Sequence, residues 1–253
     1  MPLLKFFKRG EVARDVRLQA AQGAFAPRAH EQLAILIVLL KDPDAEIRAV
    51  AAATLDRIPE ASIKGCLASS DLPAGILEFF ADRGVFPSEI PIVDADAPLL
   101  DAEPDADFSV PEAESDPQSI SQRLAKMVFP EKLKAAMKGN REMRAILIRD
   151  PNKLIAASVL SSPKVNDREV EGFARMANVS EDVLRIIGAN RAWLKNYGVV
   201  VGLTKNPKTP LAMSLNLMSR LHDRDLAMLS IDRNVPEPLR VAARRKVAEG
   251  NKS

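Results

Sequence analysis

Residues 205–212 read KNPKTPLA, and residues 149–156, 56 positions earlier, read RDPNKLIA. The similarity continues in the same register, without a gap, as far as residue 237. A repeat of this length is typical of stacked helical units. The identical pairs at this offset include Leu147 and Leu203, Pro151 and Pro207, Ala156 and Ala212, Ser158 and Ser214, Asp167 and Asp223, Arg168 and Arg224, Asn178 and Asn234, and Glu181 and Glu237.

The repeated polar residues predict where helices begin. Asp150-Pro151 and Asn206-Pro207 each combine a capping side chain with a proline, which loses no needed hydrogen bond at the first helical position. Asn178 and Asn234 each stand three residues before a glutamate, which is the spacing of a capping box. Further helix starts are expected at Asp167 and Asp223. Each 56-residue period is therefore predicted to hold about four short helices.

The N-terminal part has the same pattern. KDPDAEIRAVAAATLDRIP, at 41–59, offers Asp42-Pro43 as a helix start and then apolar side chains with helical spacing. LAILIVLL, at 33–40, is shorter than the roughly 20 residues that span a bilayer and is predicted to be a buried helix. MPLLKFFKRG, at 1–10, is interpreted either as a plain first helix or as a weak anchor on anionic lipid.

Composition favours an all-α fold. Hydrophobic residues make up 47% of the 253-residue chain, but aromatic residues only 4%, so Ala, Leu, Val and Ile supply the core. The chain has one cysteine, Cys66, and two distant histidines, His30 and His222, so we expect no metal and no cofactor. No signal-peptide pattern is present, and we place the protein in the cytoplasm.

Charge divides the chain into three parts. Residues 1–90 hold 11 basic and 12 acidic residues, residues 91–120 hold 9 acidic and no basic residues, and residues 121–253 hold 25 basic and 13 acidic residues. We predict an N-terminal helical domain (1–90), an acidic, Pro-rich disordered linker (91–120) and a basic C-terminal helical-repeat domain (121–253). The linker is either a solvated spacer or a cover for the basic part, with Leu99, Leu100 and Phe108 as anchors.

The residues of 39–59, LLKDPDAEIRAVAAATLDRIP, resemble a HEAT repeat. Residues 128–247 are similar to leucine-rich-repeat-variant and related HEAT-like helical repeats of bacterial proteins. The resemblance implies an α-solenoid of short helix-turn-helix repeats that binds macromolecules in a groove. It implies no catalytic residues. The acidic linker departs from a regular array of repeats.

Motifs for catalysis are not recognisable, because the chain has no P-loop, GxGxxG, GxSxG or HExxH. We expect a non-enzymatic scaffold or adaptor whose groove binds protein partners with acidic peptides or helices. One alternative is a nucleic-acid-binding protein that contacts phosphates, and a further one is a HEAT-like DNA glycosylase. Trp193 and Tyr197 are predicted to lie on one helix. The candidate partner-binding residues are Arg141, Arg144, Arg191, Trp193, Lys195, Tyr197, Lys205, Lys208, Arg240 and Arg244.

Overall fold

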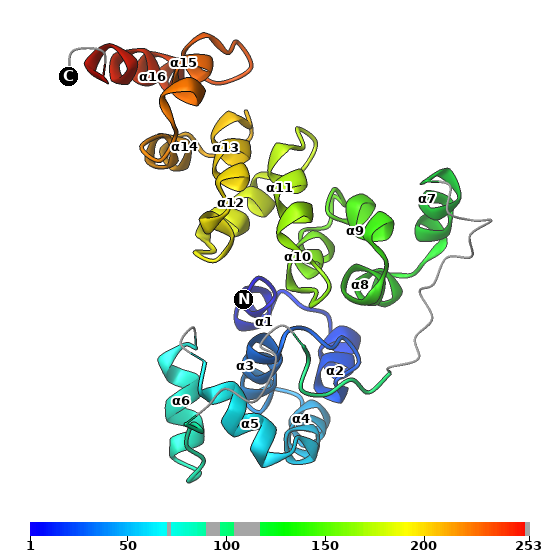
Figure 1. The fold of residues 1–253 in the computed structure, drawn as a ribbon. Helices are drawn as coiled ribbons and strands as arrows, with labels where there is room; N and C mark the ends of the chain where they lie inside the picture. Colours follow the sequence, from blue (N-terminus) through cyan, green and yellow to red (C-terminus); the bar gives the residue numbers. More distant parts are fainter. Residues whose placement is uncertain (70–71, 90–96, 104–116, 251–253) are drawn as a thin grey trace. The chain divides into compact units, whose positions relative to one another are not determined.

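The computed structural model describes residues 1–69, 72–89, 97–103 and 117–250, and this part of the chain is helical, with no β-strand (Figure 1). The predicted all-α fold is confirmed. The helices are α1 (Leu4–Arg9), α2 (Arg14–Gln22), α3 (Ala29–Leu39), α4 (Ala45–Arg57), α5 (Glu60–Leu67), α6 (Ala74–Ala81), α7 (Pro117–Lys126), α8 (Phe129–Lys138), α9 (Arg141–Leu147), α10 (Lys153–Ser161), α11 (Asp167–Arg175), α12 (Glu181–Ala189), the 3-10 helix η2 (Trp193–Lys195), α13 (Tyr197–Lys205), α14 (Leu211–Met218), α15 (Asp223–Ile231) and α16 (Glu237–Gly250).

Helix starts recur at the offset of the sequence repeat. The 56-residue spacing separates the starts of α9 and α13, of α11 and α15, and of α12 and α16. The remaining pair, α10 and α14, begins at Lys153 and Leu211. Each period therefore holds four short α-helices, as the sequence predicts, and the helix starts expected at Asp167 and Asp223 are confirmed.

Several of the predicted caps are wrong, although the helices they were meant to start exist. The residue before α12 is Ser180, whose hydroxyl accepts a hydrogen bond from Val183 N at 3.4 Å, so Asn178 is not the cap. A capping box occurs instead at α11, where the Asn166 side chain accepts from Glu169 N at 3.0 Å and Glu169 accepts from Asn166 N. A serine or asparagine directly before the first turn can reach its open N–H groups, whereas Asn178 is too early in the chain.

Asn206 ends a helix and does not start one. It is the C-terminal cap of α13, and α14 begins only at Leu211. The buried Asn206 amide donates hydrogen bonds to the carbonyl oxygens of Ala174 (2.9 Å) and Met176 (3.0 Å), at the end of α11. The reason is that carbonyl groups in the last turn of a helix lack partners within that helix. Asn206 therefore ties the end of α13 to the end of α11.

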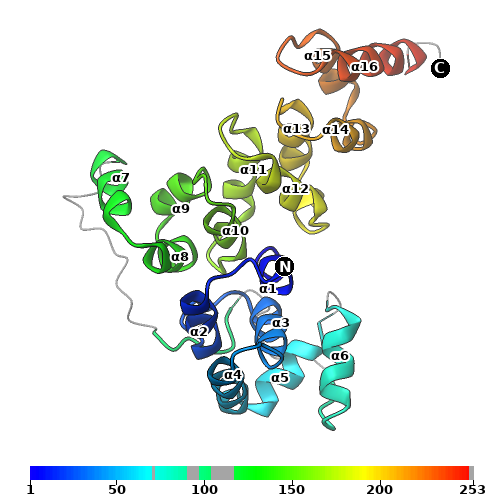
Figure 2. The ribbon, with the colours of Figure 1, turned by 180° about the vertical axis from the view of Figure 1, so that it is seen from behind.

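The chain forms two compact units. Unit 1 comprises Met1–Leu147 and Ala157–Lys164, and unit 2 comprises Ile148–Ala156 and Val165–Ser253. In unit 1, α2 packs against α3 and α4 (Figure 2). Helix α3, with Leu33, Leu36 and Leu39 fully buried, confirms the prediction of a buried helix at 33–40. In unit 2, α15 and α16 lie side by side.

A glycine, Gly202, lets α13 come close to α11 in unit 2. A Cβ atom at Gly202 would lie 3.1 Å from the Cβ atom of Ala174, and one at Gly198 would meet the Glu171 carboxylate. The separation at Gly202 is shorter than ordinary van der Waals contact, so the backbones of α11 and α13 approach there because this position lacks a side chain. At Gly198 the near atoms are the end of the flexible Glu171 side chain. Phe173 is buried in the same core.

Part of the predicted linker is described, namely residues 97–103, and it lies against helices of unit 1. Ala29 N donates to Ala97 O at 3.0 Å, and Ala102 N donates to Gly23 O at 3.2 Å. Leu99 and Leu100 are among these placed residues, whereas Phe108 and the rest of 104–116 lie outside the described residues. The boundaries predicted at residues 90 and 120 stay predictions.

Candidate functional site

The site is built around the start of α13. Asn196 caps this helix, and its side chain accepts a hydrogen bond from Gly198 N at 2.8 Å. The prediction that Trp193 and Tyr197 share one helix is wrong, because Trp193 belongs to η2 and the extended Asn196 separates it from α13. Trp193 is buried, so it packs within unit 2, while Tyr197 reaches toward α15.

Asp225, on α15, joins two of the predicted site residues. Its Oδ2 accepts a hydrogen bond from the Tyr197 hydroxyl at 2.6 Å, and its Oδ1 lies 2.8 Å from Lys205 Nζ. Hydrogen bonds from Lys205 and then from Tyr197 lower the pKa of Asp225, so the carboxylate is ionised at neutral pH. Burial and the neighbouring Asp225 raise the pKa of Tyr197, which keeps the phenol protonated.

His222 completes this cluster. Its ring stacks on the Tyr197 ring with 4.1 Å between centroids and 19° between planes. Its backbone N–H donates to the Tyr197 hydroxyl at 3.1 Å. The cluster therefore fastens the start of α15 to both ends of α13. Its chemistry is that of hydrogen bonding and ion pairing, with no activated nucleophile among the four side chains.

A groove of about 770 Å³ runs beside the cluster, within unit 2. Arg224, Asp225 and Met228 of α15 line it together with Lys205 and Arg175. Arg175 pairs with Glu171 at 2.6 Å and Lys205 pairs with Asp225. Arg224 is exposed and has no ion pair within the residues that the structure describes. The groove thus offers a guanidinium group without an ion pair, together with the carboxylate of Asp232, which accepts a hydrogen bond from Asn234 N at 2.9 Å.

Apolar surface accompanies this charge. Met228, which lines the groove, is 52% exposed. Methionine is flexible and polarizable, and it adapts to the side chains of a partner. The groove therefore combines a free cation with an adaptable apolar contact, which suits a ligand that has both acidic and apolar groups.

The other predicted site residues divide into engaged and free cations. Arg144 is buried and donates to Gly139 O at 2.7 Å, so its guanidinium group serves the interior of unit 1. Arg240 pairs with Glu237, and Arg244 donates from Nε to Ser230 O at 3.0 Å. The exposed candidates that have no ion pair in the described part of the chain are Arg141, Arg191, Lys195 and Lys208.

Arg224 and Met228 are among the groove residues that were not predicted, as are Arg175 and Asp225. Arg224 repeats Arg168 of the preceding period, and repeated polar residues at this offset are expected to mark helix starts. Their placement in a groove depends on how α15 packs beside α13, which residue spacing does not reveal. Nothing in the sequence marks Met228 as a surface residue, because an apolar residue on a helix is ordinarily assigned to the core.

No group of three or more metal-ligating side chains occurs among the described residues. Burial raises the pKa of the Cys66 thiol to about 11, so this cysteine is protonated and unreactive at neutral pH. Within the same described ranges, none of the helices combines the length and the apolar character that crossing a membrane requires.

Comparison with protein-family models, with curated proteins and with solved structures found no match for this chain.

Proposed function

We propose that this protein is a non-enzymatic scaffold, an α-solenoid of HEAT-like helix pairs, that binds acidic segments of partner proteins. The 56-residue recurrence of helix starts supports the repeat architecture. Stacked helix pairs expose long surfaces, and a protein that acts by binding needs no catalytic centre. The excess of basic residues in 121–253, 25 against 13 acidic ones, favours an acidic partner.

The observation that carries this proposal is that Arg224 and Met228 line the same groove. Both side chains are exposed, both come from α15, and the groove beside them has a volume of about 770 Å³. Glutamate or aspartate of a partner would pair with Arg224 through a charge-assisted hydrogen bond. A neighbouring apolar side chain of the same partner would bury Met228. Lys208, exposed in the turn after α13, extends the positive surface.

Peptide binding tests this function directly. We would follow the fluorescence anisotropy of a labelled Glu- and Leu-rich peptide and of labelled random duplex DNA, at several salt concentrations. The full-length protein is expected to bind the peptide. Arg224→Ser combined with Met228→Ser is expected to weaken this binding about tenfold or more, since a charged hydrogen bond and a buried apolar contact are both lost.

The matched control is Arg168→Ser, because Arg168 occupies the same position as Arg224 one period earlier and is also exposed. It should bind the peptide like the wild type. Equal affinity in the double variant and the wild type would refute the groove as the binding site. Binding of duplex DNA alone, with a steep salt dependence, would instead support the nucleic-acid alternative.

A further inference from the structure

Residues 97–103, APLLDAE, form a non-helical segment that lies on unit 1 like a bound peptide. Its backbone is held at both ends, by Ala29 N at Ala97 and by Gly23 O at Ala102. The helices it touches belong to parts of the chain about 70 residues earlier and about 30 residues later. The segment therefore makes long-range tertiary contacts with these helices, and it is not a turn that joins two consecutive helices.

Gln32, on α3, recognises the main chain of this segment. Its Oε1 accepts from Leu99 N at 2.8 Å and from Leu100 N at 3.0 Å, and its Nε2 donates to Leu100 O at 2.5 Å. Gln32 is 3% exposed with the segment in place, so these three hydrogen bonds to the main chain stand in for hydrogen bonds to water. The three hydrogen bonds of Gln32 involve only main-chain atoms of the segment, so they do not depend on its side chains.

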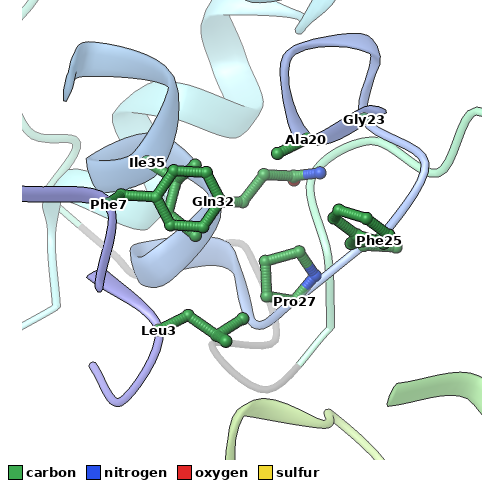
Figure 3. Close-up of a pocket in the computed structure, with 9 residues that line it drawn as sticks. Leu3, Phe7, Ala20, Gly23, Phe25, Pro27, Gln32 and Ile35 are labelled. Atoms are coloured by element: carbon green, nitrogen blue, oxygen red, sulfur yellow. The ribbon is translucent and has the colours of Figure 1, made fainter. Parts of the chain in front are cut away.

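Gly23 creates a seat for one apolar side chain. Its φ is 83°, and a Cβ atom there would lie only 3.0 Å from Leu100 Cδ2. Figure 3 shows Gln32 reaching from α3 toward Gly23 at the end of α2. The cavity at this place has a volume of about 20 Å³, which is room for about one water molecule. It is thus too small for an organic ligand.

Two lysines of α8 select acidic residues after the leucine. Lys138 Nζ lies 2.6 Å from Asp101 Oδ1 and also donates to Glu103 O at 2.8 Å. Lys134 Nζ contacts both carboxylate oxygens of Glu103, at 2.8 and 3.0 Å. The Lys138 and Asp101 side chains are 10% and 26% exposed, so water screens this pair less than a surface pair, whereas Glu103, at 45%, leaves its pair with Lys134 partly screened.

We propose that Gln32, Gly23, Lys134 and Lys138 form a second binding site, for an extended partner segment with the pattern Leu-acid-x-acid, and that residues 97–103 are its occupant within the chain. The main-chain bonds to Gln32 carry no sequence information, so specificity comes from the leucine seat and the two lysines. Any exposed segment with this pattern makes the same contacts. All four residues belong to unit 1, so the site is independent of the groove in unit 2.

The occupant from the same chain makes this site self-competing. A tethered segment has a high effective concentration at the site. It raises the apparent Kd of a partner segment by about the ratio of this effective concentration to the Kd of the tethered segment itself. Binding of a partner is therefore expected to displace residues 97–103. Weakening the tethered segment should in turn uncover the site.

The test uses a labelled peptide of sequence APLLDAE and the full-length chain. We would compare the wild type with a chain carrying Leu100→Ser, Asp101→Lys and Glu103→Lys, here called the opened chain. The opened chain is expected to bind the peptide about tenfold more tightly or better. Adding Gln32→Ala or Lys138→Ala to it should abolish this gain, whereas Lys132→Ala on the same helix should not.

A folded opened chain that binds the peptide no more tightly than the wild type would overturn the proposal. If the opened chain does not fold, the wild type provides the second measurement, by hydrogen exchange with excess unlabelled peptide. Exchange at the Leu99, Leu100 and Ala102 amides should become faster with APLLDAE and stay unchanged with APLLNAQ. Unchanged exchange with APLLDAE as well would show that residues 97–103 are a structural strap only.

Discussion

At the scale of single residues, Glu31 places a carboxyl group in the interior of unit 1. It is 3% exposed, and its Oε1 accepts hydrogen bonds from Leu3 N at 2.6 Å and Leu4 N at 3.1 Å. It therefore satisfies the open N–H groups at the start of α1. Burial raises the pKa of Glu31, and the terminal amino group and the hydrogen bonds, including one with Ser161, only partly oppose this.

A raised pKa makes the contribution of Glu31 to stability dependent on pH. The contribution is fully present below the ordinary glutamate pKa, about 4.3, where the carboxyl is neutral in both states. It is lost as the pH rises through the raised pKa of the folded state, because folding then buries a charge. In Glu31→Gln the amide oxygen still accepts from Leu3 and Leu4 but does not titrate. This variant should gain stability relative to the wild type as the pH rises.

Urea unfolding of both proteins between acidic and neutral pH checks this expectation. Glu31→Ala is the companion variant, and it should lose about 1–3 kcal/mol because two buried N–H groups lose their acceptor. Parallel curves for Glu31→Gln and the wild type at every pH would show that the pKa of Glu31 in the folded protein is the ordinary one.

At the scale of helices, the contact between α11 and α13 depends on the absence of a side chain at Gly202 of α13. A leucine at Gly202 would overlap Ala174, which lies 3.1 Å from the position of a Cβ atom. We expect Gly202→Leu to destabilise the protein by about 1–3 kcal/mol, as overpacked core positions do. The measurement is the free energy of unfolding in urea.

Gly172 of α11 provides the matched control, since a Cβ atom there meets nothing within 4 Å. Gly172→Ala should stabilise the helix by about 0.5–1 kcal/mol, because alanine loses less conformational freedom on folding than glycine does. If Gly202→Leu were as stable as the wild type, the helices would have to separate without loss, and the close packing described above would not matter.

At the scale of the whole molecule, helices that the sequence assigned to the C-terminal part are tied to residues before position 120. Lys134 and Lys138 of α8 pair with Glu103 and Asp101, and Arg28 N donates to Ser161 O at 3.5 Å. A fragment of residues 121–253 removes these partners. We expect α8 to exchange its amide hydrogens faster in the fragment than in the full chain.

Helix α16 serves as the internal reference, because it belongs to unit 2 and packs on α14 and α15. Its exchange should be the same in the fragment and in the full chain. Equal protection of α8 in both proteins would show that the contacts with residues 97–103 and with Arg28 contribute little to its stability.

The sequence by itself determined the helical fold, the 56-residue period and the helix starts at Asp167 and Asp223. These features depend on local physics, since apolar spacing and the residues near a helix start act within one or two turns. The buried helix at 33–40 and the starts at Asp167 and Asp223 were accessible for this reason. The identity of the capping residue was harder to predict. Ser180 and Asn178 are both good capping residues, and only the backbone conformation shows that Ser180 directly precedes the first turn.

Only the tertiary structure decided which polar residues are engaged and which are free. Arg144 and Arg191 look alike in the sequence, yet one is buried against Gly139 O and the other is exposed. Gln32 finds its partners 67 and 68 residues away, and Asn206 finds one 32 residues away. Such contacts leave no trace in residue spacing, because they depend on how distant helices pack, and packing is the sum of many small contacts between residues far apart in the chain.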